Sequence, residues 1–94
     1  MYRIIEGRGT GKTSRLMLLA KENNATFVCS NPHAMEYKAQ KYGIKGINFI
    51  SYGDFFNHRN EYHDKNYVVD EMESFIQELM FYHNNLIGYS LSLE

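Results

Sequence analysis

Two short segments hold residue types whose spacing suits the chemistry of phosphate groups. The first is rich in glycine and runs through Gly11 directly into Lys12 and Thr13. Glycines let a loop turn its backbone N–H groups toward phosphate oxygens, and a helix that starts there adds partial positive charge. Lys12 would place its ammonium beside the phosphates and act in catalysis, while the Thr13 hydroxyl would be a ligand of Mg²⁺.

The phosphate-binding segment predicted from this motif comprises Gly7, Arg8, Gly9, Thr10, Gly11, Lys12, Thr13 and Ser14. Its spacing follows the pattern G-x-x-x-x-G-K-[ST] with one departure, because Glu6 stands where the first glycine belongs. A carboxylate at that junction must point away from the phosphates or be paired, which Arg3 or Arg8 could do. The alternative is an ordinary glycine-rich turn ahead of a helix.

The second segment is an apolar run, Tyr67–Val69, that ends in Asp70 and Glu71. Ligands of a parallel sheet bind at the carboxyl ends of its strands, so these acids are expected beside the glycine-rich loop. Asp70 would hold Mg²⁺ through its water shell, and Glu71 would orient or deprotonate the attacking water. The alternative is that both acids only open the following helix, where the helix dipole favours them.

The elements that must position these residues alternate between strands and helices. Strands are expected at residues 2–5, 25–29, 46–51, 67–69 and 86–91, and helices from Lys12 to about Glu22, from Pro32 to a stop at Gly43, and from Met72 to a stop at Asn84–Asn85. Residues 52–54 are expected to turn away from the third strand, and residues 58–66 to form a polar connection. This order predicts an α/β fold with a mostly parallel sheet of four to five strands and helices on its faces, in a single domain over residues 1–94.

Local signals indicate where these helices start, stop and face the core. Asn31 and Pro32 are typical of an N-cap and a first helical position, and Asn23–Asn24 and Gly43 are typical stops. The apolar faces predicted for the three helices are Leu16, Leu19 and Ala20; Met35, Ala39 and Tyr42; and Met72, Phe75, Ile76 and Leu79. The run 25–29 has the continuous apolar character of a strand covered on both faces.

Charges divide unevenly along the chain although the formal net charge is only −1. Residues 1–50 hold eight basic and three acidic side chains, whereas residues 51–94 hold two basic and eight acidic ones. Two interpretations stay open: the first half binds an anion, or the two halves attract each other. The low net charge gives no global attraction to nucleic acid or to an anionic membrane.

Composition excludes several classes of protein. The single cysteine, Cys29, rules out an internal disulfide framework and fits a reducing compartment, where it would be a small buried hydrophobe. Apolar runs of only a few residues exclude a membrane-spanning segment, so no membrane partner is expected. His58 and His63 have the wrong spacing for a zinc site and fit a polar loop.

The two chemical segments together resemble the paired motifs of the P-loop NTPases. Residues 6–13 are similar to their phosphate-binding motif, and residues 67–71 to their acidic Mg²⁺ motif. The adjacent Asp70 and Glu71 are typical of the branch with a catalytic glutamate, which includes helicases, recombinases and phage terminases. The sequence of residues 7–13 is particularly similar to the corresponding motif of terminases and related phage ATPases. The resemblance implies a minimal P-loop fold that binds ATP or another NTP together with Mg²⁺ and hydrolyses the nucleotide. It also implies a role in DNA processing or DNA packaging. If the protein is phage-encoded, the expected compartment is the cytoplasm of a bacterial host.

Three further segments resemble helicase-like ATPases less specifically. Residues 27–34 and 49–55 correspond to strand–loop segments that touch single-stranded DNA, and residues 88–92 to a strand end that senses the γ-phosphate. Each is explained at least as well by ordinary sheet structure. The partner that the resemblance implies is DNA or a DNA-processing protein complex.

Helicases complete their site with an arginine finger from a second lobe, whereas residues 51–94 offer only Arg59. Hydrolysis by the isolated chain is therefore expected to be slow, because a finger raises the rate by about 10³–10⁵. A partner, or a neighbouring copy in a homo-oligomer, would have to supply it. One alternative is a non-catalytic binding module that acts through a partner protein, which Glu6 and the missing finger favour. A second is a small nucleotide kinase, for which no second substrate pocket or arginine-rich lid is evident.

Overall fold

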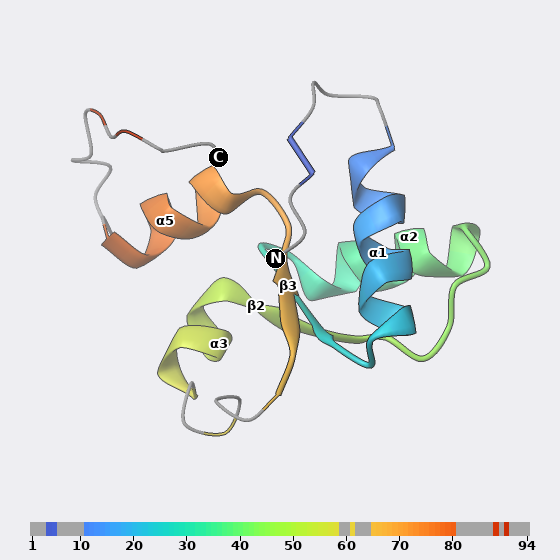
Figure 1. The fold of residues 1–94 in the computed structure, drawn as a ribbon. Coiled ribbons are helices and arrows are strands. Elements are labelled where there is room, and N and C mark those ends of the chain that lie inside the picture. Colours follow the sequence, from blue (N-terminus) through green and yellow to red (C-terminus); the bar gives the residue numbers. More distant parts are fainter. Residues whose placement is uncertain are drawn as a thin grey trace.

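The computed structural model describes residues 4–5, 11–58, 61, 65–80, 88 and 90 of the 94-residue chain. Its elements in chain order are α1 (Lys12–Glu22), β1 (Thr26–Cys29), α2 (Pro32–Lys41), β2 (Asn48–Ser51), α3 (Tyr52–Asn57), β3 (Tyr67–Val69) and α5 (Met72–Met80). Within the described residues, three strands form one parallel open sheet in the order β2-β1-β3 (Figure 1). The predicted α/β class, with a parallel sheet and helices on its faces, is confirmed.

Helices cover both faces of the sheet, with α1 and α2 on one face and α3 and α5 on the other (Figure 1). The central strand β1 is buried along its whole length, and its side chains alternate between the two layers. Phe27 and Cys29 face α1 and α2, whereas Val28 faces α3 and α5. Burial on both sides explains why this strand is not patterned as alternating apolar and polar residues.

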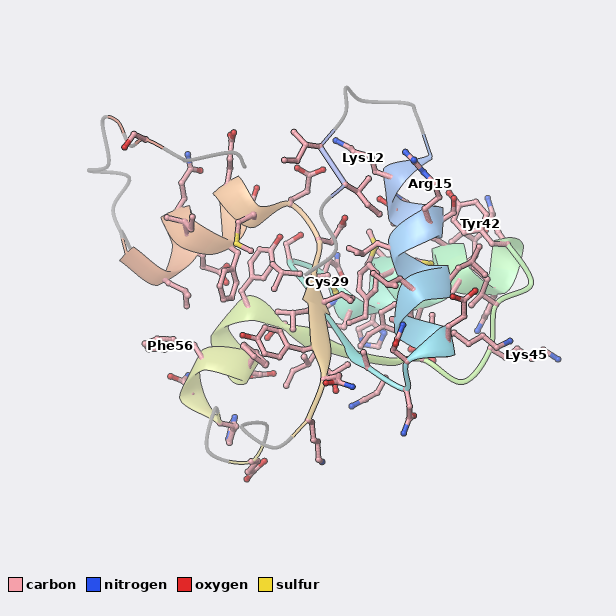
Figure 2. All side chains as sticks on the ribbon, viewed as in Figure 1. Lys12, Arg15, Cys29, Tyr42, Lys45 and Phe56 are labelled. Atoms are coloured by element: carbon pink, nitrogen blue, oxygen red, sulfur yellow. The ribbon has the colours of Figure 1, made fainter. Side chains whose placement is uncertain are left out.

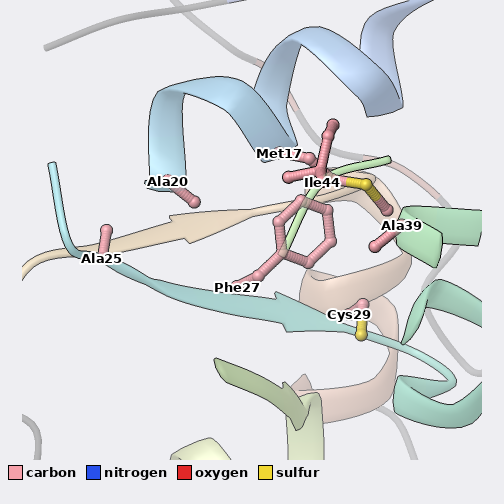
Figure 3. Packing of buried hydrophobic residues seen from close by; sticks show 7 residues of the cluster. All are labelled: Met17, Ala20, Ala25, Phe27, Cys29, Ala39 and Ile44. Atoms are coloured by element: carbon pink, nitrogen blue, oxygen red, sulfur yellow. The ribbon is translucent and has the colours of Figure 1, made fainter. Parts of the chain in front are cut away.

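Phe27 is at the centre of the packing beneath α1 and α2 (Figure 3). Its side chain has no exposed surface and shares a buried cluster with Met17 and Ala20 of α1 and Ala39 of α2. Its ring also meets the ring of Phe49 edge to face, with centroids 5.2 Å apart. The alanines on both helices leave room for this ring, so the three elements pack closely.

The ends of α1 and α2 follow the predicted capping signals. The Asn31 side chain accepts a hydrogen bond from the Ala34 amide at 3.2 Å, and Pro32 occupies the first helical turn. Gly43 has a φ of 72° just beyond α2, and Asn24 has a φ of 50° just beyond α1. Glycine and asparagine tolerate this left-handed conformation better than other residues, which is why the helices end there.

Residues 52–54 begin a helix, so the prediction of a turn leading away from the sheet is wrong. Ser51 ends β2 and also caps α3, because its hydroxyl accepts a hydrogen bond from the Asp54 amide at 3.1 Å. Tyr52 and Phe55 lie one helical turn apart and are both buried. A helix of six residues is marginal in isolation, so this burial is what stabilises it.

Two predicted members of the apolar helix faces are exposed instead. Tyr42 is 53% exposed at the C-cap of α2. Met72 is 49% exposed at the first residue of α5. The other predicted positions, Leu16, Leu19, Ala20, Met35, Ala39, Phe75, Ile76 and Leu79, are buried or half-buried as expected.

The strands expected near the two ends of the chain are not part of the described sheet. Ile4 and Ile5 lie in no strand, and neither do Gly88 and Ser90. The remaining residues of segments 2–5 and 86–91 lie outside the described residues, as do most of the polar connection and the helix stop expected at Asn84–Asn85.

The uneven charge along the chain becomes an uneven charge across the sheet. The described basic side chains of the α1–α2 layer and its loop are Lys12, Arg15, Lys21, Lys38, Lys41 and Lys45, against the acids Glu22 and Glu36. Figure 2 shows Lys12, Arg15 and Lys45 on that side of the molecule. The charged residues described in α3 and α5 are all acidic: Asp54, Glu73 and Glu78. The sheet separates most of these charges, and the Lys12–Glu71 ion pair is one contact that joins the two halves of the chain.

Candidate functional site

At the carboxyl edge of the sheet, the chain leaves neighbouring strands in opposite directions. After β1 it enters α2 on one face, and after β3 it enters α5 on the other face (Figure 1). Such a divergence between adjacent strands opens the crevice in which open α/β sheets bind their ligands. Asp70 and Glu71 follow β3 directly and therefore stand at this crevice.

Helix α1 brings Lys12 to the same edge of the sheet. Its Nζ lies 3.9 Å from Oε1 of Glu71, and Figure 2 shows the side chain at the start of the helix. The two residues predicted as catalytic, although distant in sequence, are thus brought together as an ion pair. Both side chains retain contact with solvent, so the pair can open without a large rearrangement.

The start of α1 offers positive potential to an anion. Gly11 precedes the helix with a φ of 78°, a conformation that favours glycine, and provides no capping side chain. No acidic residue lies in the first turn, so the positive end of the helix is not neutralised from within. The Ser14 hydroxyl donates a hydrogen bond to the Gly11 carbonyl oxygen at 3.1 Å, which stabilises the first turn of α1. Of the predicted segment, Gly7, Arg8, Gly9 and Thr10 lie outside the described residues, as does Glu6.

Asp70 is hydrogen-bonded to the central strand and lies near the start of α1. Its amide donates to the Val28 carbonyl oxygen at 2.9 Å, which extends the pairing of β3 with β1 by one residue. The Thr13 side chain is close enough to lower the pKa of the Asp70 carboxyl group. The two predicted Mg²⁺ ligands, Thr13 and Asp70, therefore lie near each other at the carboxyl edge.

Opposing influences act on the Asp70 carboxyl group. Burial, followed by the nearby Glu71 carboxylate, raises the pKa of Asp70 above its ordinary value. Lys38, Lys12 and the Thr13 side chain lower the pKa and limit that rise. A partly desolvated carboxylate next to a second one is stabilised by any cation bound close to it.

The donor set suits Mg²⁺ bound together with a polyphosphate. Mg²⁺ takes one or two carboxylates and completes its octahedral shell with water and phosphate oxygens. Asp70 and Thr13 supply one carboxylate and one hydroxyl. Among the described residues, no group of three or more His, Cys, Asp or Glu is arranged to hold a metal ion. An ion at this edge would therefore take most of its ligands from water and from phosphate.

Two residues at the site are not identified by the sequence motifs. Tyr52 is buried at the start of α3, and its hydroxyl donates to the backbone carbonyl oxygen of Asp70 at 2.6 Å. Lys38 is exposed on α2, yet close enough to lower the pKa of Asp70. In the sequence, Tyr52 has the signal of a core aromatic and Lys38 that of a surface lysine, so neither pattern indicates a site.

The segments that resemble DNA-contacting loops are largely structural where they are described. Within residues 27–34, the first three are buried and Asn31 caps α2. Within residues 49–55, Tyr52 and Phe55 are buried. The named positions therefore have a structural role in the core or in a helix cap, whereas Ser30, His33 and Asp54 of these segments are exposed.

Cys29 ends the central strand close to Asp70. Burial, followed by the Asp70 carboxylate, raises the pKa of the Cys29 thiol to about 11. The thiol is therefore protonated at neutral pH and is not a nucleophile.

A cavity of about 170 Å³ lies away from these residues, between α2 and β2. It is lined by Pro32, His33, Glu36, Ile47, Asn48 and Phe49. None of these belongs to the predicted site. We place the candidate site at the carboxyl edge instead, because the Lys12–Glu71 ion pair and the half-buried Asp70 carboxyl group are found there.

No protein-family model, curated protein or solved structure matches the chain. The resemblance to P-loop NTPases therefore depends on the two motifs. In the part of the chain that the structure describes, no helix has the length and apolar character that a membrane crossing requires.

Proposed function

We propose that this chain binds an NTP, with ATP as the first candidate, together with Mg²⁺ at the carboxyl edge of the sheet, in the manner of the P-loop NTPases. The observation that supports this most is the 3.9 Å approach of Lys12 Nζ to Glu71 Oε1. A residue type that holds phosphate and one that activates water come from separate motifs and meet at the divergence of β1 and β3. Beside them, Thr13 and Asp70 supply oxygens for Mg²⁺.

Each residue has a separate role in the proposed site. Backbone N–H groups of residues 7–14 would surround the phosphates at the positive end of α1. Lys12 would exchange its contact with Glu71 for one with the phosphates. Glu71, released in this way, would orient or deprotonate the attacking water. Mg²⁺, when bound, neutralises charge that develops on the phosphates, and Asp70 would hold it through water.

The wider context of the proposal comes from the resemblance. It includes the P-loop fold with further strands near residues 2–5 and 86–91, slow hydrolysis by the isolated chain, and work in a DNA-processing or DNA-packaging complex. An arginine finger would come from a partner or from a second copy. Such a finger would raise the hydrolysis rate by about 10³–10⁵.

A titration with Mg·ATP tests the binding step. Lys12→Ala is expected to weaken the affinity by about 10- to 150-fold, because a hydrogen bond to a charged group contributes about 1.5–3 kcal/mol. Lys21→Ala is the matched control, since Lys21 lies exposed in the last turn of the same helix. Equal affinities of Lys12→Ala and the wild type would contradict the proposed site.

Phosphate release tests the hydrolysis step. Glu71→Gln keeps the shape of the side chain and removes its charge, so release is expected to fall by about 10²–10⁴. Release that is unaffected by Glu71→Gln would come from a contaminating ATPase.

Binding without phosphate release would favour a second candidate, a non-catalytic nucleotide-binding module that acts through a partner protein. The ion pair between Lys12 and Glu71 also suits this candidate, because both charges then stabilise the fold.

A further inference from the structure

Tyr52 is a buried residue whose hydroxyl meets the backbone of both site acids. Its side chain is only 2% exposed. The hydroxyl donates to the Asp70 carbonyl oxygen at 2.6 Å, and the Glu71 carbonyl oxygen lies 3.3 Å from it. Since a hydroxyl carries one proton, the shorter contact is the main hydrogen bond.

This contact reaches from one edge of the described sheet to the other. Tyr52 follows β2, whereas Asp70 and Glu71 follow β3, and β1 lies between the two strands. Because β1 separates the two strands, the Tyr52 side chain and its 2.6 Å hydrogen bond together bridge the central strand. It packs in one cluster with Val28 of β1, and the ring of Phe75 lies edge to face at a centroid distance of 5.3 Å. The ring is therefore held from two sides while the hydroxyl reaches the turn.

The turn that Tyr52 contacts has an unusual backbone. Glu71 has a φ of 57°, and a residue other than glycine in this conformation costs about 1–2 kcal/mol. The Glu71 carbonyl oxygen also accepts the amide hydrogen bond of Phe75 at 3.1 Å, at the start of α5. Tyr52 thus connects the end of β3 to the start of α5, and a movement of this turn would move both carboxylates.

We propose that Tyr52 is a positioning residue for the hydrolysis proposed above: by holding the Asp70–Glu71 turn, it fixes the direction in which the two carboxylates leave the sheet. This inference rests on the proposed function and adds a residue that lies outside both motifs. Burial, followed by the nearby Asp70 carboxylate, raises the pKa of the Tyr52 hydroxyl above its ordinary value. The hydroxyl therefore stays a hydrogen-bond donor throughout the neutral range.

Tyr52→Phe is the test, because it removes the hydroxyl and keeps the ring that packs on Val28 and Phe75. The kcat for phosphate release is expected to fall about tenfold or more, since a displacement of about 1 Å at a catalytic group costs up to about 10²-fold. The affinity for Mg·ATP is expected to stay within about twofold, because the proposed phosphate-binding residues lie at the start of α1 and in the loop before it, and Asp70 would hold Mg²⁺ only through water. A loss in kcat without a loss in affinity distinguishes positioning from general damage to the fold.

Tyr67→Phe is the matched control. Its ring also packs on an aromatic neighbour, Phe55 at 4.7 Å, but the residue is 52% exposed, and its kcat is expected to equal that of the wild type. Amide hydrogen exchange gives a second measurement that needs no nucleotide. The Asp70 and Phe75 amides are expected to exchange faster in Tyr52→Phe than in Tyr67→Phe. All comparisons are made at a temperature at which circular dichroism shows both variants folded.

The outcomes separate this inference from the proposed function. A kcat of Tyr52→Phe equal to that of a wild type that releases phosphate would overturn the inference alone. Parallel losses of kcat and Mg·ATP affinity would also overturn it, because they indicate a structural role. A wild type that releases no phosphate would overturn the hydrolysis and the inference together. Unchanged affinity of Lys12→Ala would show that the proposed site itself is wrong.

Discussion

Lys12 has two competing anions at the proposed site, the Glu71 carboxylate and the phosphates of a nucleotide. The Nζ–Oε1 distance is 3.9 Å, and the two side chains are 22% and 56% exposed. An ion pair this open to solvent contributes about 0.2–1 kcal/mol. In the proposed mode of binding, Lys12 exchanges this pair for a contact with the phosphates. Removing the charge of Glu71 is therefore expected to strengthen nucleotide binding by this amount, or about 1.5- to 5-fold.

Calorimetric titration with a non-hydrolysable Mg·ATP analogue measures this competition. The wild type, Lys12→Ala, Glu71→Gln and the double variant form a double-mutant cycle. In the Lys12→Ala background, Glu71→Gln should strengthen binding less, because no ion pair has to be broken. The gain should also shrink as salt is added, since exposed charges are screened. Glu73→Gln is the control, because Glu73 is an exposed acid in the first turn of α5.

Weaker binding by Glu71→Gln would refute this reasoning, because Glu71 would then contribute to the bound state. An equal gain in affinity from Glu71→Gln in the wild type and in the Lys12→Ala variant would also refute this reasoning. Such a result would mean that Glu71 only repels the phosphates and does not compete for Lys12.

Two further predictions concern the central strand. Phe27→Ala is expected to lower the free energy of unfolding, measured by urea denaturation, by about 3–5 kcal/mol, because Phe27 is fully buried. Phe56→Ala is the control, and it should lower the free energy of unfolding far less because Phe56 is 45% exposed. Equal losses would contradict the described core. Burial raises the pKa of the Cys29 thiol from 9.0 to about 11, above the pKa of the same thiol in the unfolded chain. The contribution of this shift to the free energy of unfolding is therefore complete below pH 9 and is lost as the pH rises through 11. Across this range the wild type should lose up to about 1.4 kcal/mol per pH unit relative to Cys29→Ala, and a constant difference between the two would contradict the prediction.

Elements whose limits depend on neighbouring residues can be predicted from this sequence. Asn31, Pro32 and Gly43 define α2 by local capping, and the observed helix agrees with them. Helix α3 cannot be predicted in the same way, because it contains Gly53 and only one apolar repeat. Its stability comes from burial against Val28 and Phe75, which belong to elements distant in sequence.

The candidate site is predictable in its residue types but not in its contacts. Motif spacing singles out Lys12 and Glu71, and the rule for parallel strands expects them at one edge. Neither indicates that the two would form an ion pair with each other. The hydrogen bond of Tyr52 depends on β1 lying between β2 and β3, and no local pattern encodes the order of strands.

The separation of charge between the two helical layers gives the described part of the molecule an electric dipole directed across the sheet. From far away, the protein is nearly neutral, with a formal net charge of −1. Within a Debye length, about 8 Å in physiological salt, another molecule meets one sign of charge or the other, according to its side of approach. A polyphosphate therefore meets mostly basic side chains at the α1–α2 layer and acidic ones at α3 and α5. Its side of approach, more than the net charge of the protein, sets the sign of the charge that it meets.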